Sequence, residues 1–471
     1  MKKIVLSIAG VMAIAAFAPE ASALPVFARQ TGMACSACHF QHFPLLNGFG
    51  RSFKAGGFTM MGAQAKIEGD NLSIPAELNM AVLTSLGYVK TNQTADTTGV
   101  TKNYGNGVWG VPGAGAAGGA NEASLFFGGH VSDFAGFLSE LGLGGASAAL
   151  GSAKLPILFP VGDSRVGVVP FATDAQGASY TMETLNTGAN AVHMQSNTVG
   201  PNNEFANALS AQQYLNTAGA AMGMGFVATN DMGFINITKY QQTGITAGTV
   251  ASLGSTYARI AGTFDMAGWD SAVGIQNWSG ASLNAVVPGV VTAGTLIPGS
   301  NPAAFTAPTT TTAAAGGIMT QTKATAIDGQ MQGDIGGLPV GFYASYARAP
   351  AAPVGLVNTY NTNMSGVAGT LTRSSFNVNA EVGVLPGIAT IGAGVRQGKS
   401  GVADLAGNNL TDNAVMLTAT YKLQQNMMAR LSYVSQTGGF WNNANTGVAG
   451  TATNSQVIGS KTTMLNMYVL F

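Results

Sequence analysis

The chain has 471 residues, and its 20 basic and 20 acidic side chains make up only 8% of it, against about 25% in ordinary soluble proteins. A net charge of zero gives no reason to expect a nucleic-acid partner, because phosphates need a basic surface. The chain is nevertheless too apolar for disorder, because 46% of its residues are hydrophobic and its mean hydropathy is positive. These numbers predict a surface that faces lipid.

The first 23 residues have the pattern of a secretory signal. Lys2 and Lys3 precede an apolar stretch over residues 4–17, and residues 21–23 read Ala-Ser-Ala, a small-residue cleavage site. We therefore expect residues 1–23 to be removed before Leu24; the alternative is a retained anchor. No other stretch approaches the roughly 18 consecutive apolar residues of a membrane helix, so we expect an exported protein without helical spans.

From about residue 70 onward, short runs alternate between apolar and polar residues. Phe376, Val378 and Val382 fall on one face of such a run, with Asn377 and Glu381 on the other. This period of two is typical of a half-buried β-strand. We count about 16 such runs, most of them near the ten residues that a tilted strand needs to cross a bilayer. The runs lie near residues 73–90, 121–130, 135–144, 149–158, 163–172, 219–229, 232–242, 255–265, 268–279, 322–333, 338–348, 373–384, 388–397, 412–422, 426–436 and 458–471.

The connections between these runs alternate in length. Short turns follow the even-numbered runs, and longer loops follow most odd-numbered ones, the longest near residues 173–218 and 280–321. Short periplasmic turns and long outer loops are typical of an outer-membrane barrel. The fold class predicted for residues 71–471 is therefore an all-β, porin-like transmembrane barrel of antiparallel strands; the alternative is a soluble β-sandwich or solenoid.

The two faces of the predicted strands point to the same architecture. The last run has an alternating apolar face, Leu465, Met467, Val469 and Phe471, which resembles the C-terminal signature of bacterial outer-membrane barrels. Because lipid offers no water to a sheet edge, the strands must close on one another. We expect the polar face to line the lumen, including Asn377, Glu381, Arg396, Lys422 and Arg430.

Both cysteines of the chain lie in one motif, Cys35-Ser36-Ala37-Cys38-His39. In an exported chain, C-x-x-C-H indicates covalent attachment of one c-type haem, with His39 as the proximal iron ligand. A disulfide or redox pair is the alternative, and a zinc site would lack ligands.

The distal haem ligand has several candidates. Met60 and Met61 follow a glycine-rich turn that lets the chain fold back over the ring. His42 is the rival, but on a helix it shares a face with His39 and is better explained as a polar residue beside the haem propionates. His130 and His193 fall in the barrel and in a loop, and we expect them to line the lumen or that loop.

Residues 24–70 are too few for a free-standing cytochrome domain. A haem supplies part of the missing apolar core, and the lumen of the barrel is the obvious host for the rest. We therefore expect this monohaem cytochrome segment to plug the periplasmic half of the barrel.

The N-terminal block resembles the fused monohaem cytochrome–porins, whose best-known members are outer-membrane iron oxidases. The resemblance covers about 35 residues and rests on Phe27-Ala28-Arg29, Cys35, Cys38, His39, Phe43-Pro44, Leu46-Asn47, Phe49-Gly50-Arg51, Phe53-Lys54 and Gly57-Phe58. It implies an outer-membrane protein that oxidises extracellular Fe(II) or another electron donor; with Fe(II), the protein would be an iron:cytochrome c oxidoreductase. Electrons would pass through one haem c to a periplasmic cytochrome.

Two other functions are compatible with a haem segment inside a barrel. The haem could be a structural or sensory plug in a porin-like channel, or electrons could leave the cell for an extracellular acceptor. The sequence does not name an iron site, because the carboxylates that a ferrous ion prefers are scattered, among them Asp96, Asp174, Glu183, Asp404 and Asp412.

Overall fold

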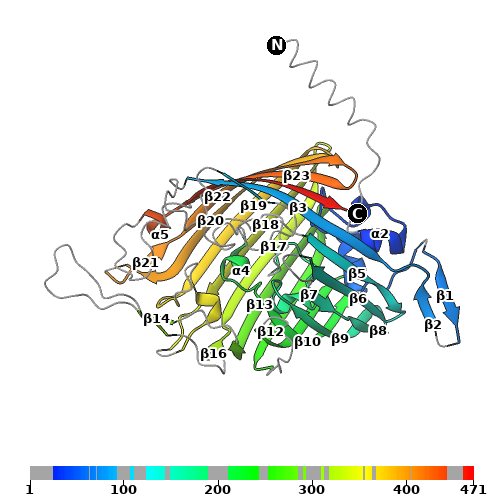
Figure 1. Cartoon of the computed structure of the whole chain (residues 1–471), viewed down its shortest axis with the longest axis horizontal. Coiled ribbons are helices and arrows are strands. Elements are labelled where there is room, and N and C mark those ends of the chain that lie inside the picture. The colour runs from blue at the N-terminus through cyan, green and yellow to red at the C-terminus, as the bar shows by residue number, and fades with distance from the viewer. Residues whose placement is uncertain are drawn as a thin grey trace, which may run out of the picture.

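The computed structural model describes residues 25–62, 64–70, 72–92, 107–110, 123–143, 149–188, 210–242, 253–284, 290–292, 309–311, 318–353, 356–362, 368–404, 406–442 and 460–471. Within these residues, 16 antiparallel strands form one closed barrel (Figure 1). Four of the 16 are interrupted, so that two successive labelled pieces pair with the same neighbour. The predicted signal, residues 1–23, lies outside the described residues.

The strands of the barrel follow one another in chain order around the ring. They are β3 (Met80–Thr91), β4 (Val108–Gly110), β5 (Ala123–Ser132), β6 (Ala135–Gly142), β7 (Ala149–Lys154), β8 (Ile157–Val161), β9 (Ser164–Thr173), β10 (Ala221–Asn230), β11 (Gly233–Gln241), β12 (Ser255–Met266), β13 (Trp269–Asn284), β16 (Ile318–Gln321), β17 (Ala324–Ile335), β18 (Leu338–Ala349), β19 (Arg373–Leu385), β20 (Ala389–Ala403), β21 (Asn409–Thr411), β22 (Asn413–Gln424), β23 (Met427–Thr437) and β24 (Lys461–Leu470). Outside the barrel, β1 (Lys66–Gly69) pairs with β2 (Leu72–Pro75), and β14 (Val290–Thr292) pairs with β15 (Thr309–Thr311).

The barrel closes between its last and first strands. β24 pairs with β3 from Thr462↔Thr91 to Leu470↔Leu83. Phe471 extends the seam beyond β24, because its amide donates to the Val82 carbonyl at 3.0 Å and its carbonyl accepts from the Val82 amide at 2.7 Å. The closure leaves this seam without a free edge, as a sheet in lipid requires.

The predicted barrel is confirmed, and each predicted run contains a strand. Two of the predicted runs are each divided between two strands. The run at 73–90 spans part of β2, which belongs to the hairpin outside the barrel, and β3. The run at 149–158 is divided between β7 and β8 at Leu155-Pro156, because proline has no amide hydrogen to donate to the ladder.

The outer face of the barrel carries a continuous apolar band. Ile260, Ile275 and Ile327 are 54%, 57% and 54% exposed and lie side by side across β12, β13 and β17. The row continues laterally to Ile235 on β11 and Tyr346 on β18. An apolar outer band on a closed sheet is the arrangement by which strands span a bilayer.

The inward face is polar, which confirms the predicted lumen. The inward side chains Asn377, Glu381 and Arg396 are each 1% exposed. They are buried although water could fill a barrel of this strand number, because other segments of the chain occupy the space. Arg430 is also buried, and Lys422 is half-buried.

One of these segments is the N-terminal block, residues 25–62, which we call the plug. It contains α2 (Pro25–Thr31), the 3₁₀ turn η1 (Cys35–Ala37) and α3 (Gly48–Ala55). Its contacts fall at the short-turn end of the barrel, for example from Gln41 to Pro339 and from Arg51 to Asp270. None of the helices in the described ranges is long and apolar enough to span a membrane.

The second segment is the loop between β9 and β10, whose described parts are residues 174–188 and 210–220. It contains η3 (Ala178–Tyr180) and α4 (Ala211–Tyr214), and α4 lies within the ring of strands (Figure 1). The loop leaves and rejoins the wall at the long-loop end of the barrel, as expected, since Ala221 pairs with Thr173. Its described parts turn into the lumen because Glu183 and Tyr214 find buried partners on the wall. The other described short helices are η5 (Thr359–Asn361) and α5 (Gly439–Asn442).

The lipid-facing band yields a test of the membrane-spanning barrel. Ile275 lies near the middle of β13 and points outward, so Ile275→Arg should lower the free energy of unfolding by roughly 2–4 kcal/mol. The measurement is denaturant unfolding in lipid vesicles, with Ile275→Val as the matched control. Equal stability of the Arg and Val variants would mean that this face does not contact lipid.

Candidate functional site

The plug is held together around the C-x-x-C-H motif. Asn47 caps α3, since its side-chain oxygen accepts from the Gly50 amide at 2.9 Å. The same side chain donates to the Ala37 carbonyl at 3.0 Å, which ties the start of α3 to the motif. Gly50 allows this approach, because a Cβ there would lie 2.1 Å from the Cys38 carbonyl oxygen. The helix therefore packs directly on the residues predicted to carry the haem.

Two contacts between polar side chains fasten the plug to the barrel wall. His42 Nε2 donates to Glu381 Oε1 on β19 at 2.8 Å, and both side chains are almost fully buried. Arg51 Nη2 donates to Asp270 Oδ2 on β13 at 2.7 Å. Both wall residues lie near the short turns of the barrel, so the plug sits at the end predicted to face the periplasm.

His39 has the arrangement of a metal-ligating histidine. Its Nδ1 lies 3.0 Å from the Leu45 carbonyl oxygen, so Nδ1–H donates there and Nε2 carries the lone pair. Burial lowers the pKa of His39 to about 4, which keeps the imidazole neutral at neutral pH. A neutral, oriented ring is the form that binds iron.

The two cysteines are free thiols. Burial raises the pKa of Cys35 to about 12, and it raises the pKa of Cys38 as well. Redox-active C-x-x-C pairs have lowered thiol pKa values, so this environment disfavours the redox alternative. The motif lies on a short 3₁₀ turn at which Cys38 and His39 border the same cavity.

That cavity, which we call the haem cavity after the cofactor that the motif predicts, has a volume of about 490 Å³, within the range of about 300–1,000 Å³ for cofactor sites. Its lining is mostly apolar and comes from both the plug and the wall. The plug supplies Phe27, Met33, Cys38, His39, Phe43, Leu46, Phe53 and Phe58, and the wall supplies Leu83, Phe126, Leu138 and Tyr468. Cys35 instead borders a smaller space of about 40 Å³, which His39 and Phe43 also line.

The candidate distal ligands Met60, Met61 and His42 do not line this cavity, although His42 borders the smaller space beside Cys35 and His39. Met33, by contrast, is among the residues that line the haem cavity. Both ring nitrogens of His42 face acceptors, because Nδ1 lies 2.6 Å from the Phe43 carbonyl oxygen and Nε2 contacts Glu381. His42 therefore serves as a link between the plug and the wall.

The remaining histidines were expected to line the lumen or a loop. His130 on β5 is buried, and its Nδ1 lies 2.9 Å from the Thr59 carbonyl oxygen of the plug, as expected of a lumen residue. His193 lies outside the described residues.

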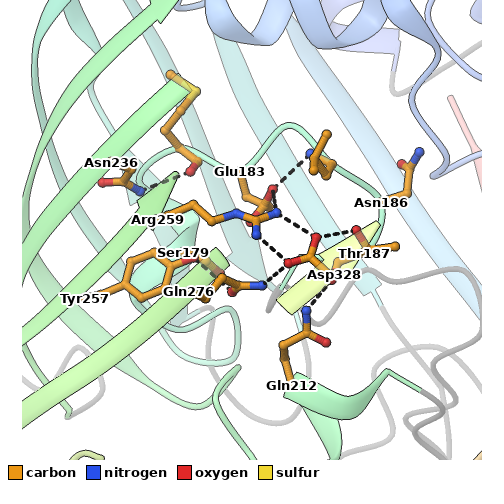
Figure 2. Close-up of polar contacts among 12 residues, drawn as sticks. Ser179, Glu183, Asn186, Thr187, Gln212, Asn236, Tyr257, Arg259, Gln276 and Asp328 are labelled. Atoms are coloured by element: carbon orange, nitrogen blue, oxygen red, sulfur yellow. Dashed lines mark hydrogen bonds and ion pairs between the residues drawn. The ribbon is translucent and has the colours of Figure 1, made fainter. Parts of the chain in front are cut away.

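A buried ion cluster holds the inward loop across the lumen (Figure 2). Arg259 on β12 binds Asp328 on β17 through both of its terminal nitrogens, one of them at 2.9 Å, and its Nε lies 3.2 Å from Glu183 of the loop. Thr187 Oγ1 donates to Asp328 at 2.6 Å. Removal of one partner from such a cluster typically costs about 3–5 kcal/mol, so the loop is firmly seated over the plug.

Sequence reasoning did not find several residues that line the haem cavity, among them Lys54, Glu140 and Lys154. The period of two predicts that Ser152 and Lys154 face the lumen, but only the barrel register brings them to the plug. Of the scattered carboxylates, Asp174 and Glu183 line this cavity, and Asp412 pairs with Arg396. In the described ranges no group of three or more His, Cys, Asp or Glu side chains is placed to hold a metal ion.

No protein-family model and no curated protein matches the chain. Among solved structures, the chain is similar to in-vitro folded OmpT of Vibrio cholerae, with a TM-score of 0.47, 10% identity, and coverage of 86% of this chain and 99% of that one. It is also similar to the anion-selective porin from Comamonas acidovorans (TM-score 0.43, 13% identity, 84% and 99% covered). Similarity to Salmonella typhi OmpF has a TM-score of 0.44 and 11% identity, and it covers 86% of this chain and 100% of that one.

The close contact between α3 and the motif can be tested at Gly50. Gly50→Ala should force the helix off Cys38 and destabilise the plug by about 1–3 kcal/mol, the usual cost of overpacking. Faster trypsin cleavage after Arg51 and Lys54 in outer-membrane preparations would report this change. Gly219→Ala, where the nearest atom lies 3.7 Å from the new Cβ, is the control, and equal cleavage of both variants would contradict the packing.

Proposed function

We propose that the protein is an outer-membrane electron-transfer protein that oxidises extracellular Fe(II) by means of a single haem c and supplies electrons to a periplasmic cytochrome. The observation that carries the proposal is His39: an oriented, neutral imidazole next to Cys38, bordering a mostly apolar cavity inside the barrel. The resemblance of residues 27–58 to fused cytochrome–porins supports the choice of Fe(II) as the donor.

The residues at the motif fit a c-type haem. Cys35 and Cys38 supply two thiols for covalent attachment, and His39 supplies the proximal ligand. The aromatic rings of the plug exclude water from the space beside His39; Phe27 and Phe58 stack at 4.7 Å, and Phe53 packs edge-on against Phe27 at 5.1 Å. When bound, the haem supplies a carrier that takes up and releases one electron at a time.

The barrel accounts for the position of the proposed haem within the outer membrane. Its apolar outer band places it in the outer membrane, and its short-turn end, where the plug lies, faces the periplasm. A soluble cytochrome can therefore approach the plug from that side. Oxidation of iron outside the periplasm also keeps insoluble Fe(III) out of the cell.

Covalent attachment is the first test. The double variant Cys35→Ser, Cys38→Ser should lose the haem that stays with the chain on a denaturing gel, since both thioether bonds would be absent. A variant with Met60→Leu and Met61→Leu should keep that haem, because neither side chain borders the cavity. A wild-type chain without covalent haem would refute the proposal.

Fe(II) oxidation is the second test. Stopped-flow mixing of the purified holoprotein with Fe(II) should reduce the haem, with one electron taken up per chain. His39→Ala should slow this reaction by at least about a hundredfold, as loss of an axial ligand alters the carrier itself. Stable haem that Fe(II) reduces at no pH would leave the structural plug or sensor as the function, and a strongly negative potential would favour electron export.

A further inference from the structure

We propose that Lys54 and Lys154 bind the two propionate carboxylates of the haem. This inference rests on the proposed function and gives a role to two charged residues that line the same cavity. The ligand class is a dianionic organic cofactor. The two lysines come from the two parts that form the site, Lys54 from α3 of the plug and Lys154 from β7 of the wall.

The side-chain amine of Lys154 is buried, and no carboxylate lies close to it among the described residues. Its side chain borders the haem cavity, and the residue is only 4% exposed. Its Nζ donates to the Tyr180 carbonyl at 2.9 Å and stands 4.2 Å over the Tyr180 ring and 5.5 Å from the centre of the Phe58 ring. In the described part of the chain no carboxylate lies within 4.0 Å of this nitrogen.

The carboxylates nearest to the cavity have other partners. Glu140 Oε1 accepts from Ser124 at 2.9 Å, and Glu183 is held by Arg259 at 3.2 Å. Asp174 also borders the cavity, but no oxygen of its carboxyl lies within 4.0 Å of the Lys154 nitrogen. A charged amine at Lys154 would therefore lack a paired counter-ion in the cavity wall, and an anionic ligand would supply one.

Lys54 adds a second amine to the same region. It borders the same cavity as Lys154, so that a ligand filling the cavity meets both side chains. Two protonated amines at one cavity are stabilised by a ligand with two negative charges. A haem carries two carboxylates on adjacent positions of its ring, which matches this requirement.

Arg430 is the competing anchor, because it also borders the cavity and its Nε and Nη2 lack partners among the described residues. It lies on β23, and the Arg430→Gln variant in the experiment below distinguishes it from the two lysines.

The experiment is a redox titration of purified holoprotein variants. Lys154→Gln and Lys54→Gln should each lower the haem midpoint potential, because loss of a nearby positive charge stabilises the ferric state. The expected change in the reduction equilibrium is on the order of tenfold for each variant. Lys154→Arg should restore most of the wild-type potential, and resonance Raman propionate modes should shift in the two Gln variants.

The control is Lys66→Gln on the β1–β2 hairpin, which removes the same charge outside the cavity. Unchanged potentials and propionate modes in both Gln variants, with covalent haem still present on a denaturing gel, would overturn the propionate assignment and leave the proposed function intact. A shift seen only in Arg430→Gln would overturn it as well. Absence of covalent haem from the wild-type chain would refute the proposed function instead.

Discussion

Pairing of every backbone hydrogen bond within lipid is the constraint on which this structure depends. Because the bilayer offers no water to a strand edge, the sheet has to close, and β24 completes the ring by pairing with β3. Closure with so many strands creates a wide lumen, and the alternation of side chains makes that lumen polar. The way in which the chain then fills this lumen distinguishes it from an open barrel.

The plug and the inward loop fill the lumen by different interactions. The loop is held by charge, through Arg259, Asp328 and Glu183, which are buried and therefore strongly coupled. The plug combines two polar side-chain contacts to the wall with an apolar interior, in which Val26 of α2 packs against Leu83 and Phe126 of the wall. A segment this short gains from the barrel the apolar surface that it cannot supply itself.

The haem cavity arises from this shared burial. Its walls belong partly to the plug and partly to the inward loop and the strands β3, β5, β6, β7, β23 and β24, so neither part forms the site alone. The plug provides the groups that would attach and ligate a haem, and the wall provides most of the remaining boundary. Under the proposed function, attachment of the cofactor and insertion of the plug would stabilise each other, because each contributes apolar surface that the other buries.

The sequence alone determined the features that depend on local pattern. The period of two located the strands and their faces, so the outward Phe376 and the inward Asn377 were assigned correctly. The spacing of Cys35, Cys38 and His39 specified a candidate haem motif. Turn length indicated which end of the barrel faces the periplasm, and the plug lies there as expected.

The tertiary structure decided which distant residues meet, because side chains from strands far apart in the chain converge only after the barrel closes. It placed Glu381 against His42 and Lys154 against the plug, and it turned residues 174–188 inward. It also left Met60 and Met61 outside the lining of the haem cavity. No local sequence pattern predicts these contacts, since the strand register and the path of the inward loop are set by the packing of the whole lumen.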